Sequence, residues 1–270
     1  MKNIIYLLAI VLFASCETQV DIPLNTSNPK LVIDANILWQ KGTSGSTQKI
    51  KLTTTTDFYS SVIPVVSGAT VIVTNSINTV FTFTEIPNTG EYVCANFEPW
   101  INENYTLTVK YAGQSYTATE KLLATPSINS TEQKTVEGFG GDVIQVKFLF
   151  QDNGSEVNHY LIGVKSPLDI APKYRAQKDE FFQGNQMFGF YTDKDLKAGD
   201  QLFFSLEGIS LRYFNYMEKL VSMSGGNGGS PFATPPATLR GNIKNQTDEN
   251  NYPLGYFHLS EIDTRNYTVN

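Results

Sequence analysis

The sequence predicts a mainly β protein with a single helix in its mature part. Val, Thr and aromatic residues are abundant, with 14 Tyr and 17 Phe in 270 residues, and these side chains favour strands. Short segments of alternating apolar and polar residues recur along the chain, separated by turn residues. Only one segment, about residues 210–222, repeats its apolar residues with the period of a helix.

The first predicted domain covers residues 30–124. Its strand-like segments are separated by short turns and cover residues 31–39, 48–55, 70–74, 79–84, 90–95, 105–111 and 115–121. In Tyr105-Thr-Leu-Thr-Val-Lys-Tyr111 the apolar residues share one face, and Gly113 closes a hairpin into the next strand. Cys94, in such a strand, is expected to be a small buried residue. Seven strands in about ninety residues predict an immunoglobulin-like β-sandwich.

The second predicted domain covers residues 125–270 and begins at the Pro- and Ser-containing segment 125–130. Alternation predicts strands at 142–151, 201–206, 254–260 and 267–269, and residues 158–165 are the expected antiparallel partner of 142–151. Residues 167–192 are aromatic but irregular and receive no assignment. Leu211, Phe214 and Met217 mark one face of the helix at 210–222, which the glycine-rich segment 224–231 ends.

The N-terminus has the pattern of a lipoprotein signal. Lys2 precedes eleven apolar residues from Ile4 to Ala14, too few to span a bilayer but typical of a signal peptide. Small residues then lead to Cys16, so residues 1–15 are expected to be removed and Cys16 lipidated, followed by a tether at 16–29. Phe13 departs from the usual leucine, and an ordinary signal peptide with an incidental cysteine is the alternative. Lipidation would attach the chain to a membrane through Cys16.

Composition excludes several functions. The net charge of −6 and pI near 5.0 argue against nucleic-acid binding, which depends on Lys and Arg. With Cys16 lipidated, Cys94 has no disulfide partner. The only histidines, His159 and His258, are expected to be surface residues or satisfied strand residues, and no metalloprotease, nucleophile-elbow or phosphate-loop motif occurs. We therefore expect no cofactor and no metal site.

Two weaker signals remain. Asp179 and Glu180 would be the acids of a hydrolase, although neighbours on a strand point to opposite faces. Phe181 and Phe182 are the aromatic candidates for a partner contact, because one of two adjacent residues in an extended segment faces away from the core. The loop after the helix supplies the other candidates, Gly228, Gly229, Pro231 and Phe232. Core packing and an ordinary surface loop explain the same residues without any function.

The order of short motifs resembles one known family. The motifs are Cys16, 29–33 (PKLVI), 68–71 (GATV), 90–92 (GEY), 199–200 (GD), 213–216 (YFNY), 231–232 (PF), 242–243 (NI) and 254–257 (LGYF). Their order over nearly the whole chain resembles the domain of unknown function 4249 family of Bacteroidota. The resemblance implies an outer-membrane lipoprotein, often encoded beside a TonB-dependent receptor, without established biochemical activity. It carries over no catalytic or ligand-binding residues.

Together these observations lead to one functional expectation and two alternatives. We expect a non-enzymatic lipoprotein, lipid-anchored in the outer membrane at the cell surface or in the periplasmic leaflet. It would act as an accessory or substrate-capturing partner of a TonB-dependent transporter. The first alternative is an adhesive or structural surface lipoprotein, such as a fimbrial anchor, with an exposed sheet edge. The second is a carboxylate-dependent hydrolase with two acids in a deep cleft.

Overall fold

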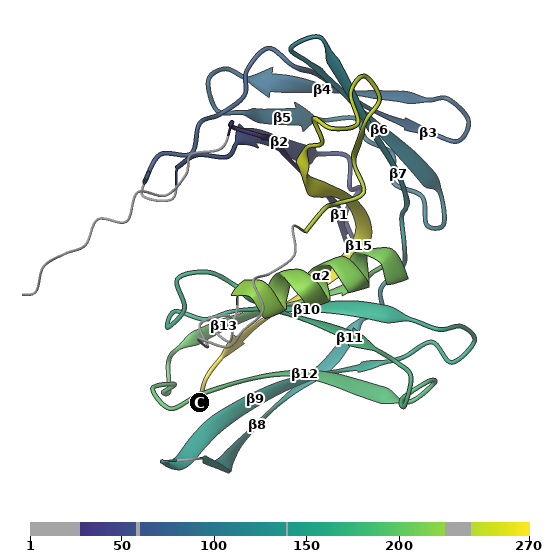
Figure 1. The fold of residues 1–270 in the computed structure, drawn as a ribbon. Helices are drawn as coiled ribbons and strands as arrows, with labels where there is room; N and C mark the ends of the chain where they lie inside the picture. Colours follow the sequence, from purple (N-terminus) through teal and green to yellow (C-terminus); the bar gives the residue numbers. More distant parts are fainter. Residues whose placement is uncertain (1–27, 58–59, 139, 225–238) are drawn as a thin grey trace, which may run out of the picture.

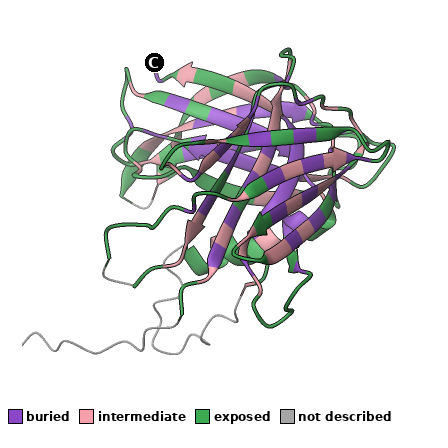
Figure 2. Ribbon diagram, turned by 90° about the horizontal axis from the view of Figure 1, so that it is seen from above, coloured by how far each residue is buried: buried purple, intermediate pink, exposed green. Residues whose placement is uncertain are grey.

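The computed structural model describes residues 28–57, 60–138, 140–224 and 239–270 and shows two β-sandwiches, one above the other in Figure 1. Most of these residues lie in strands. Buried and exposed residues alternate along many of the strands (Figure 2), because successive side chains of a strand point to opposite faces. The mainly β fold predicted from the sequence is confirmed.

The first sandwich contains the strands that the alternation predicts, with ends that differ by at most two residues. They are β1 (Leu31–Gln40), β2 (Gln48–Thr54), β3 (Thr70–Asn75), β4 (Val80–Ile86), β5 (Glu91–Cys94), β6 (Asn104–Tyr111) and β7 (Gln114–Lys121). β4 pairs with both β5 and β3 and so joins the two layers. The core between them includes Ile33, Ile50, Tyr92 and Leu107, all fully buried.

The hairpin between β6 and β7 forms as predicted. The two strands pair in antiparallel register from Asn104 with Lys121 to Tyr111 with Gln114. The turn between them contains Ala112 and Gly113, with φ angles of 49° and 74°. Consecutive residues in the left-handed region match the twist of the flanking strands, which explains the glycine.

The second sandwich packs a three-stranded sheet against the end of a larger one. The smaller sheet has the order β12 (Gln186–Asp193), β9 (Gly141–Gln151), β8 (Ile128–Gly138). The facing layer has the order β11 (Lys173–Lys178), β10 (His159–Lys165), β13 (Gln201–Gly208) and the C-terminal part of β15 (Leu254–Thr268). Phe148, Phe150 and Phe204 are fully buried between the two layers.

One predicted pairing is wrong. Residues 158–165 were expected to pair with 142–151, but β9 pairs with β8 and β12, and β10 lies in the opposite layer. The strands that pair with β10 and β9 at these positions, β11 and β12, lie in the unassigned region 167–192 except for the last residue of β12. β11 is an edge strand with little burial, and on β12 Phe188 is exposed beneath the ammonium of Lys147, 4.4 Å from its ring centre. The sequences of the two strands therefore lack apolar–polar alternation, although burial alternates along β12.

The C-terminal strand joins the two sandwiches. β15 pairs in parallel with β1 from Leu254 to Ile262 and in antiparallel register with β13 from Ile262 to Thr268. The segments 254–260 and 267–269, expected as separate strands, thus belong largely to one strand. The short β14 (Lys244–Asn245) pairs with β7. The C-terminal part of the predicted second domain therefore pairs with strands of both sandwiches.

Helix α2 (Leu211–Ser224) lies on the outer face of the second sandwich, against β10 and β11 (Figure 1). The Ser210 hydroxyl accepts a hydrogen bond from the Tyr213 N–H at 3.2 Å and caps the helix. Tyr213, Phe214 and Met217 form its buried face. The helix thus has the predicted position, and Phe214 and Met217 are buried as predicted, whereas Leu211 is 56% exposed and Tyr213 takes its place on the buried face. Among the described residues, no helix is long and apolar enough to span a membrane.

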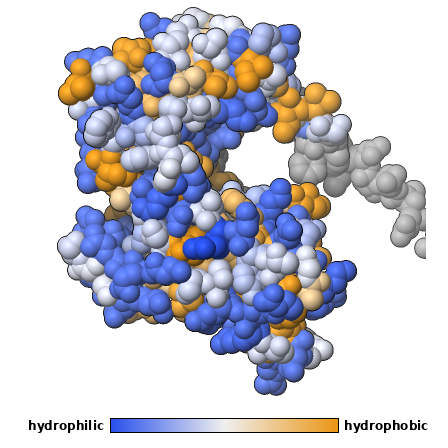
Figure 3. Space-filling view, turned by 180° about the vertical axis from the view of Figure 1, so that it is seen from behind, coloured by the Kyte–Doolittle hydropathy of each residue, from blue (hydrophilic) through white to orange (hydrophobic). Residues whose placement is uncertain are grey.

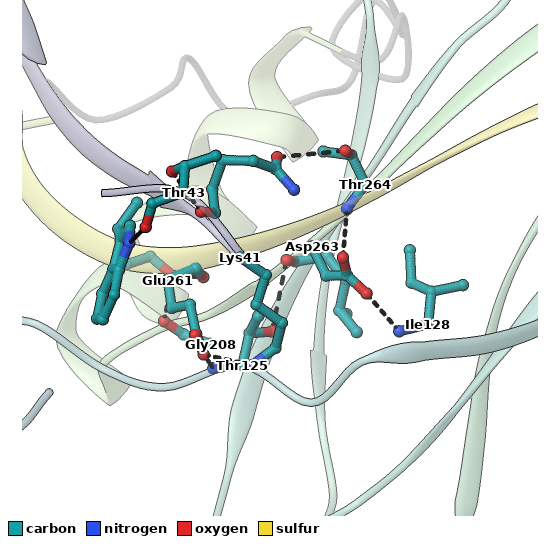
Figure 4. A network of polar contacts seen from close by, with 12 residues as sticks. Lys41, Thr43, Thr125, Ile128, Gly208, Glu261, Asp263 and Thr264 are labelled. Atoms are coloured by element: carbon teal, nitrogen blue, oxygen red, sulfur yellow. Dashed lines mark hydrogen bonds and ion pairs between the residues drawn. The ribbon is translucent and has the colours of Figure 1, made fainter. Parts of the chain in front are cut away.

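A polar network holds the connection between the sandwiches against β15 (Figure 4). The Glu261 Oε2 atom accepts hydrogen bonds from Lys41 Nζ at 2.7 Å and from the Thr125 N–H at 3.0 Å. Asp263 Oδ2 accepts the Ile128 N–H at 2.7 Å. Because Glu261 is only 9% exposed, its bonds to β1 and to the connecting segment are only weakly screened by water. This network fixes where the second sandwich begins.

Candidate functional site: a tyrosine pocket at the junction

The site begins with the alternation of β1 and β15. On β1, Ile33 points into the first core, whereas Asp34 and Asn36 point to the outer face. On β15, Phe257 points into the same core and Tyr256 lies on the other face. Parallel pairing places Asp34 beside Tyr256. The outer face of the first sandwich thus presents polar and aromatic side chains at the place where helix α2 of the second sandwich approaches it.

A pocket of about 390 Å³ lies between this face, strands β10, β11 and β13, and helix α2. We call it the tyrosine pocket. It is defined by Tyr174, Tyr213, Tyr216, Tyr256, Asp34 and Glu207. Residues of both sandwiches form its wall, so it exists only when the two are assembled. Figure 3 shows, from behind, the notch between the two sandwiches.

Aromatic rings stack in the pocket wall. The rings of Tyr213 and His258 are parallel within 16°, with centroids 3.8 Å apart. Tyr256 contacts both Tyr213 and Tyr216, with centroid distances of 4.8 and 4.7 Å. Such pairs contribute roughly 0.5–1.5 kcal/mol each beyond the area they bury. The stack connects α2 to β15 and gives the pocket a rigid wall.

Behind this wall lies a buried pair of ionisable groups. Glu207 is 5% exposed and His258 1% exposed, and His258 Nε2 lies 3.1 Å from Glu207 Oε2. The other ring nitrogen, Nδ1, is buried and has no hydrogen-bond partner among the described residues. A buried polar atom without a partner is costly. The contact with His258 therefore holds the Glu207 carboxylate in place. It also lowers the stability of the fold relative to two well-packed apolar side chains at the same positions.

Two carboxylates, those of Asp34 and Glu207, line the pocket. Loss of hydration raises the pKa of Asp34, and Lys51 and Lys49 on the neighbouring strand only partly oppose this. The Asn36 amide donates a hydrogen bond of 2.5 Å to Asp34 Oδ1. Burial raises the pKa of Tyr213 and Tyr174, and the nearby charges of Glu207 and Asp34 raise both further. The described residues that line the pocket include no Lys or Arg.

A second, larger pocket of about 640 Å³ lies on the other side of Tyr174, beneath the C-terminal half of α2. Its charged side chains are of both signs, and Arg175 lies 4.6 Å from the centre of the Phe190 ring. Lys173 is paired with Asp169 at 2.7 Å. We take the smaller pocket as the candidate site, because two carboxylates, those of Asp34 and Glu207, line it together with four tyrosines.

The candidate residues from the sequence lie elsewhere. Phe181 is 84% exposed and Phe182 39% exposed in the connection between β11 and β12, and neither lines the tyrosine pocket. Cys16, Gly228, Gly229, Pro231 and Phe232 lie outside the described residues.

The carboxylates of Asp179 and Glu180 do not converge. Asp179 is buried and its Oδ2 accepts the Asn158 N–H at 2.7 Å. Glu180 is exposed and forms an ion pair with Lys178. In the part of the chain that the structure describes, no three His, Cys, Asp or Glu side chains form a group suited to a metal ion.

Sequence reasoning missed Asp34 and Glu207. A signal was present at Asp34, because Asp34 and Asn36 interrupt an otherwise apolar strand on alternate positions. His258 was expected to be exposed or satisfied, and the structure instead buries it with Nδ1 unpartnered. The expected burial of Cys94 is confirmed, with Sγ 3.2 Å from Asn96 Oδ1.

The fold and the pocket define a tandem β-sandwich protein with a helix-covered pocket at its junction. A family model described as "Domain of unknown function (DUF4249)" matches residues 17–266. The chain belongs to this family, which confirms the resemblance drawn from the motif order. Among curated proteins none matches this chain.

The matches to solved structures are distant in both sequence and structure. One is a cytokine receptor complex, with 7% identity over 67% of this chain and 84% of that one and a TM-score of 0.26. Another is a two-domain fibronectin type III segment of chicken tenascin, with 10% identity over 67% and 91% and a TM-score of 0.22. A DUF4785 family protein of Legionella pneumophila has 11% identity over 66% and 51% and a TM-score of 0.25.

Proposed function

We propose that this protein is an outer-membrane lipoprotein, anchored through Cys16, that acts as a non-enzymatic, substrate-capturing partner of a TonB-dependent transporter. Lipidation would confine the protein to the plane of the membrane and raise its effective concentration beside the receptor. The N-terminal signal pattern and the family resemblance support the location. The tyrosine pocket supports the capture of a substrate.

The pocket is the single observation that carries the binding role. Small-molecule sites are concave, mostly apolar, and contain a few converging polar groups, with volumes of roughly 300–1,000 Å³. The tyrosine pocket, at about 390 Å³, has this character.

Copurification tests the proposal directly. A tagged full chain would be isolated from outer membranes solubilised in a mild detergent, and the bound proteins would be identified by mass spectrometry. We expect a β-barrel receptor to be recovered with the wild-type chain and to be depleted with a Cys16→Ser variant. Recovery of the wild-type chain without any β-barrel receptor would count against the proposal.

The adhesive alternative requires a sheet edge open to strand addition. β8 is an edge strand of eleven residues. Its exposed positions include Glu132, Lys134 and Glu137, and charged residues on an edge strand discourage pairing with another chain. The charged residues of β8 therefore argue against strand addition at this edge. We consider an adhesive role less well supported than substrate capture, for which the pocket provides a site.

The hydrolase alternative gains one specific observation, although not at Asp179 and Glu180. Asp34 and Glu207 line one pocket, and loss of hydration raises the pKa of Asp34, as a general acid requires. Glu207, however, is held by His258. Glycosidase assays with chromogenic substrates would detect the activity, and its loss in both Asp34→Asn and Glu207→Gln would establish a carboxylate pair.

A further inference from the structure

We propose that the tyrosine pocket binds an organic cation, a compact ammonium group carried by the captured substrate. This inference rests on the proposed capture function and names its substrate class. It is carried by three features of the pocket: its charge, its aromatic walls and the position of its most accessible groups.

The charge of the pocket selects a cation. Asp34 and Glu207 both contribute carboxylates, whereas the described lining residues include no Lys or Arg that would neutralise them. Lys51, opposite Asp34 on β2, and Lys49 both act on the Asp34 carboxylate from a distance, but neither forms an ion pair with it among the described residues, and Lys49 is bound to Glu91 at 3.0 Å. Glu207 has a partner in His258, whereas Asp34 accepts a hydrogen bond from the neutral amide of Asn36. A bound cation would pair with Asp34 directly, which neither lysine does.

The aromatic walls suit the same ligand. Ammonium and quaternary ammonium groups are attracted to the faces of tyrosine rings by the ring quadrupole, and most strongly where water is excluded. Four tyrosines surround the pocket. One face of Tyr213 is covered by His258, so the more accessible rings of Tyr174 and Tyr216 are the ones that we expect to contact the cation.

The accessible groups lie where a ligand would enter. Tyr174 is 40% exposed and Asp34 is also exposed, whereas Tyr213 and Glu207 are buried. We therefore assign Asp34 to the mouth of the pocket, as the group that first meets the cation, and Tyr213 and Glu207 to its floor. The His258 ring packs behind Tyr213 and holds Glu207, which makes His258 a positioning residue.

Two isosteric probes test the inference on the unaltered protein. Choline and 3,3-dimethylbutan-1-ol have the same shape and differ in the positive charge. Isothermal titration calorimetry at low salt would use the full lipidated chain in a non-ionic detergent. We expect choline to bind at least about tenfold more tightly than the alcohol. Tetramethylammonium and butylammonium would be titrated in the same way.

Variants then locate the site. Asp34→Asn is expected to weaken choline binding about tenfold, and Tyr216→Leu to weaken it several-fold, as typical cation–π contributions imply. Glu132→Gln is the matched control, because Glu132 is an exposed acid on β8, and it should leave binding unchanged. Circular dichroism melting would show that each variant is folded.

Three results would overturn the inference. They are equal binding of choline and its neutral isostere, no binding of any of the three cations at millimolar concentration, and choline binding that Asp34→Asn leaves intact. These outcomes are separate from the copurification test. A receptor partner without cation binding would preserve the capture proposal and remove this substrate class, whereas cation binding without a receptor would do the reverse.

Discussion

His258 lies flat against Tyr213, with ring centroids 3.8 Å apart, and its Nε2 atom is paired with Glu207. One residue of β15 thus contacts both the helix and the strand β13 of the second sandwich. Because this contact is buried, it couples the wall of the tyrosine pocket to the stability of the junction. The coupling can be measured.

The buried pair leads to the first prediction. His258→Phe keeps an aromatic ring against Tyr213 but leaves Glu207 without its partner, and we expect a loss of about 3 kcal/mol in the free energy of unfolding. Glu207→Met should have a similar cost. The loss of unfolding free energy in the double variant should be smaller, by at least about 1 kcal/mol, than the sum of the losses in the two single variants. Urea denaturation measures all four proteins, and simple additivity would contradict the pairing.

The polar network at the junction leads to the second prediction. Glu261→Leu removes the acceptor of the Lys41 ammonium and of the buried Thr125 N–H, and should destabilise the protein by about 2 kcal/mol. Lys41→Met should cost less, because it leaves no buried N–H unpaired. Lys49→Met, at an exposed ion pair with Glu91, is the control and should cost under about 1 kcal/mol. Equal effects at Glu261 and Lys49 in urea denaturation would argue against the network.

Gly255 leads to the third prediction. It has a φ of +93°, and a Cβ there would lie 2.0 Å from the carbonyl oxygen of Ile33 on β1. Gly255→Ala should therefore cost more than about 3 kcal/mol or prevent folding. Gly113→Ala is the matched control, with a φ of +74° and open space around the position. It should cost only about 1 kcal/mol, for the backbone conformation alone. Thermal melting compares the two, and similar melting temperatures would contradict the parallel pairing.

Asp34 leads to a prediction on pH. Its pKa is raised in the folded protein, so the folded state binds more protons than the unfolded state between the two pKa values, and stability falls as the pH rises through that interval. Asp34→Asn should therefore raise the melting temperature at pH 7. The difference should disappear at a pH below the ordinary Asp pKa of about 3.9, where the wild-type residue is protonated in both states. A lower melting temperature for the variant at pH 7 would refute this assignment.

The two cysteines provide a test of lipidation. Burial raises the pKa of the Cys94 thiol, and its side chain is enclosed in the first core. A thiol reagent should therefore label none of the native lipoprotein and one thiol per chain in denaturant. Cys94→Ala should abolish the labelling. Intact mass measurement counts the labels, and two labelled thiols in denatured protein from membranes would show that Cys16 carries no lipid.

Several features of the fold were predictable because they are local. The seven strands of the first sandwich follow from alternation within each segment, and the hairpin around Gly113 from the backbone freedom of glycine. The helix follows from the period of its apolar residues and from the glycine-rich segment that ends it. Strands β11 and β12 were not predicted, because their sequences do not alternate between apolar and polar residues. β11 is an edge strand with little burial, and on β12 the exposed Phe188 is covered by the ammonium of Lys147.

The candidate site was far less predictable. Polar residues at Asp34 and Asn36 signalled an unusual strand face, but no local pattern connects them to Glu207. The helix was visible in the period of its apolar residues, whereas the contact of Tyr213 with His258 was not. Strand partners are chosen by long-range packing, which a short window of sequence does not contain.

The amino-acid sequence alone determined the mainly β class, the family resemblance and the expectation of a lipid at Cys16, since each depends on residues close together or on the order of motifs. The tertiary structure decided which strands pair and that a pocket exists. Its walls come from segments far apart in the sequence, and they meet because β15 pairs in parallel with β1 and continues into the sheet of the second sandwich. The burial of the pocket residues and the proximity of the Asp34 and Glu207 carboxylates arise only when these segments assemble.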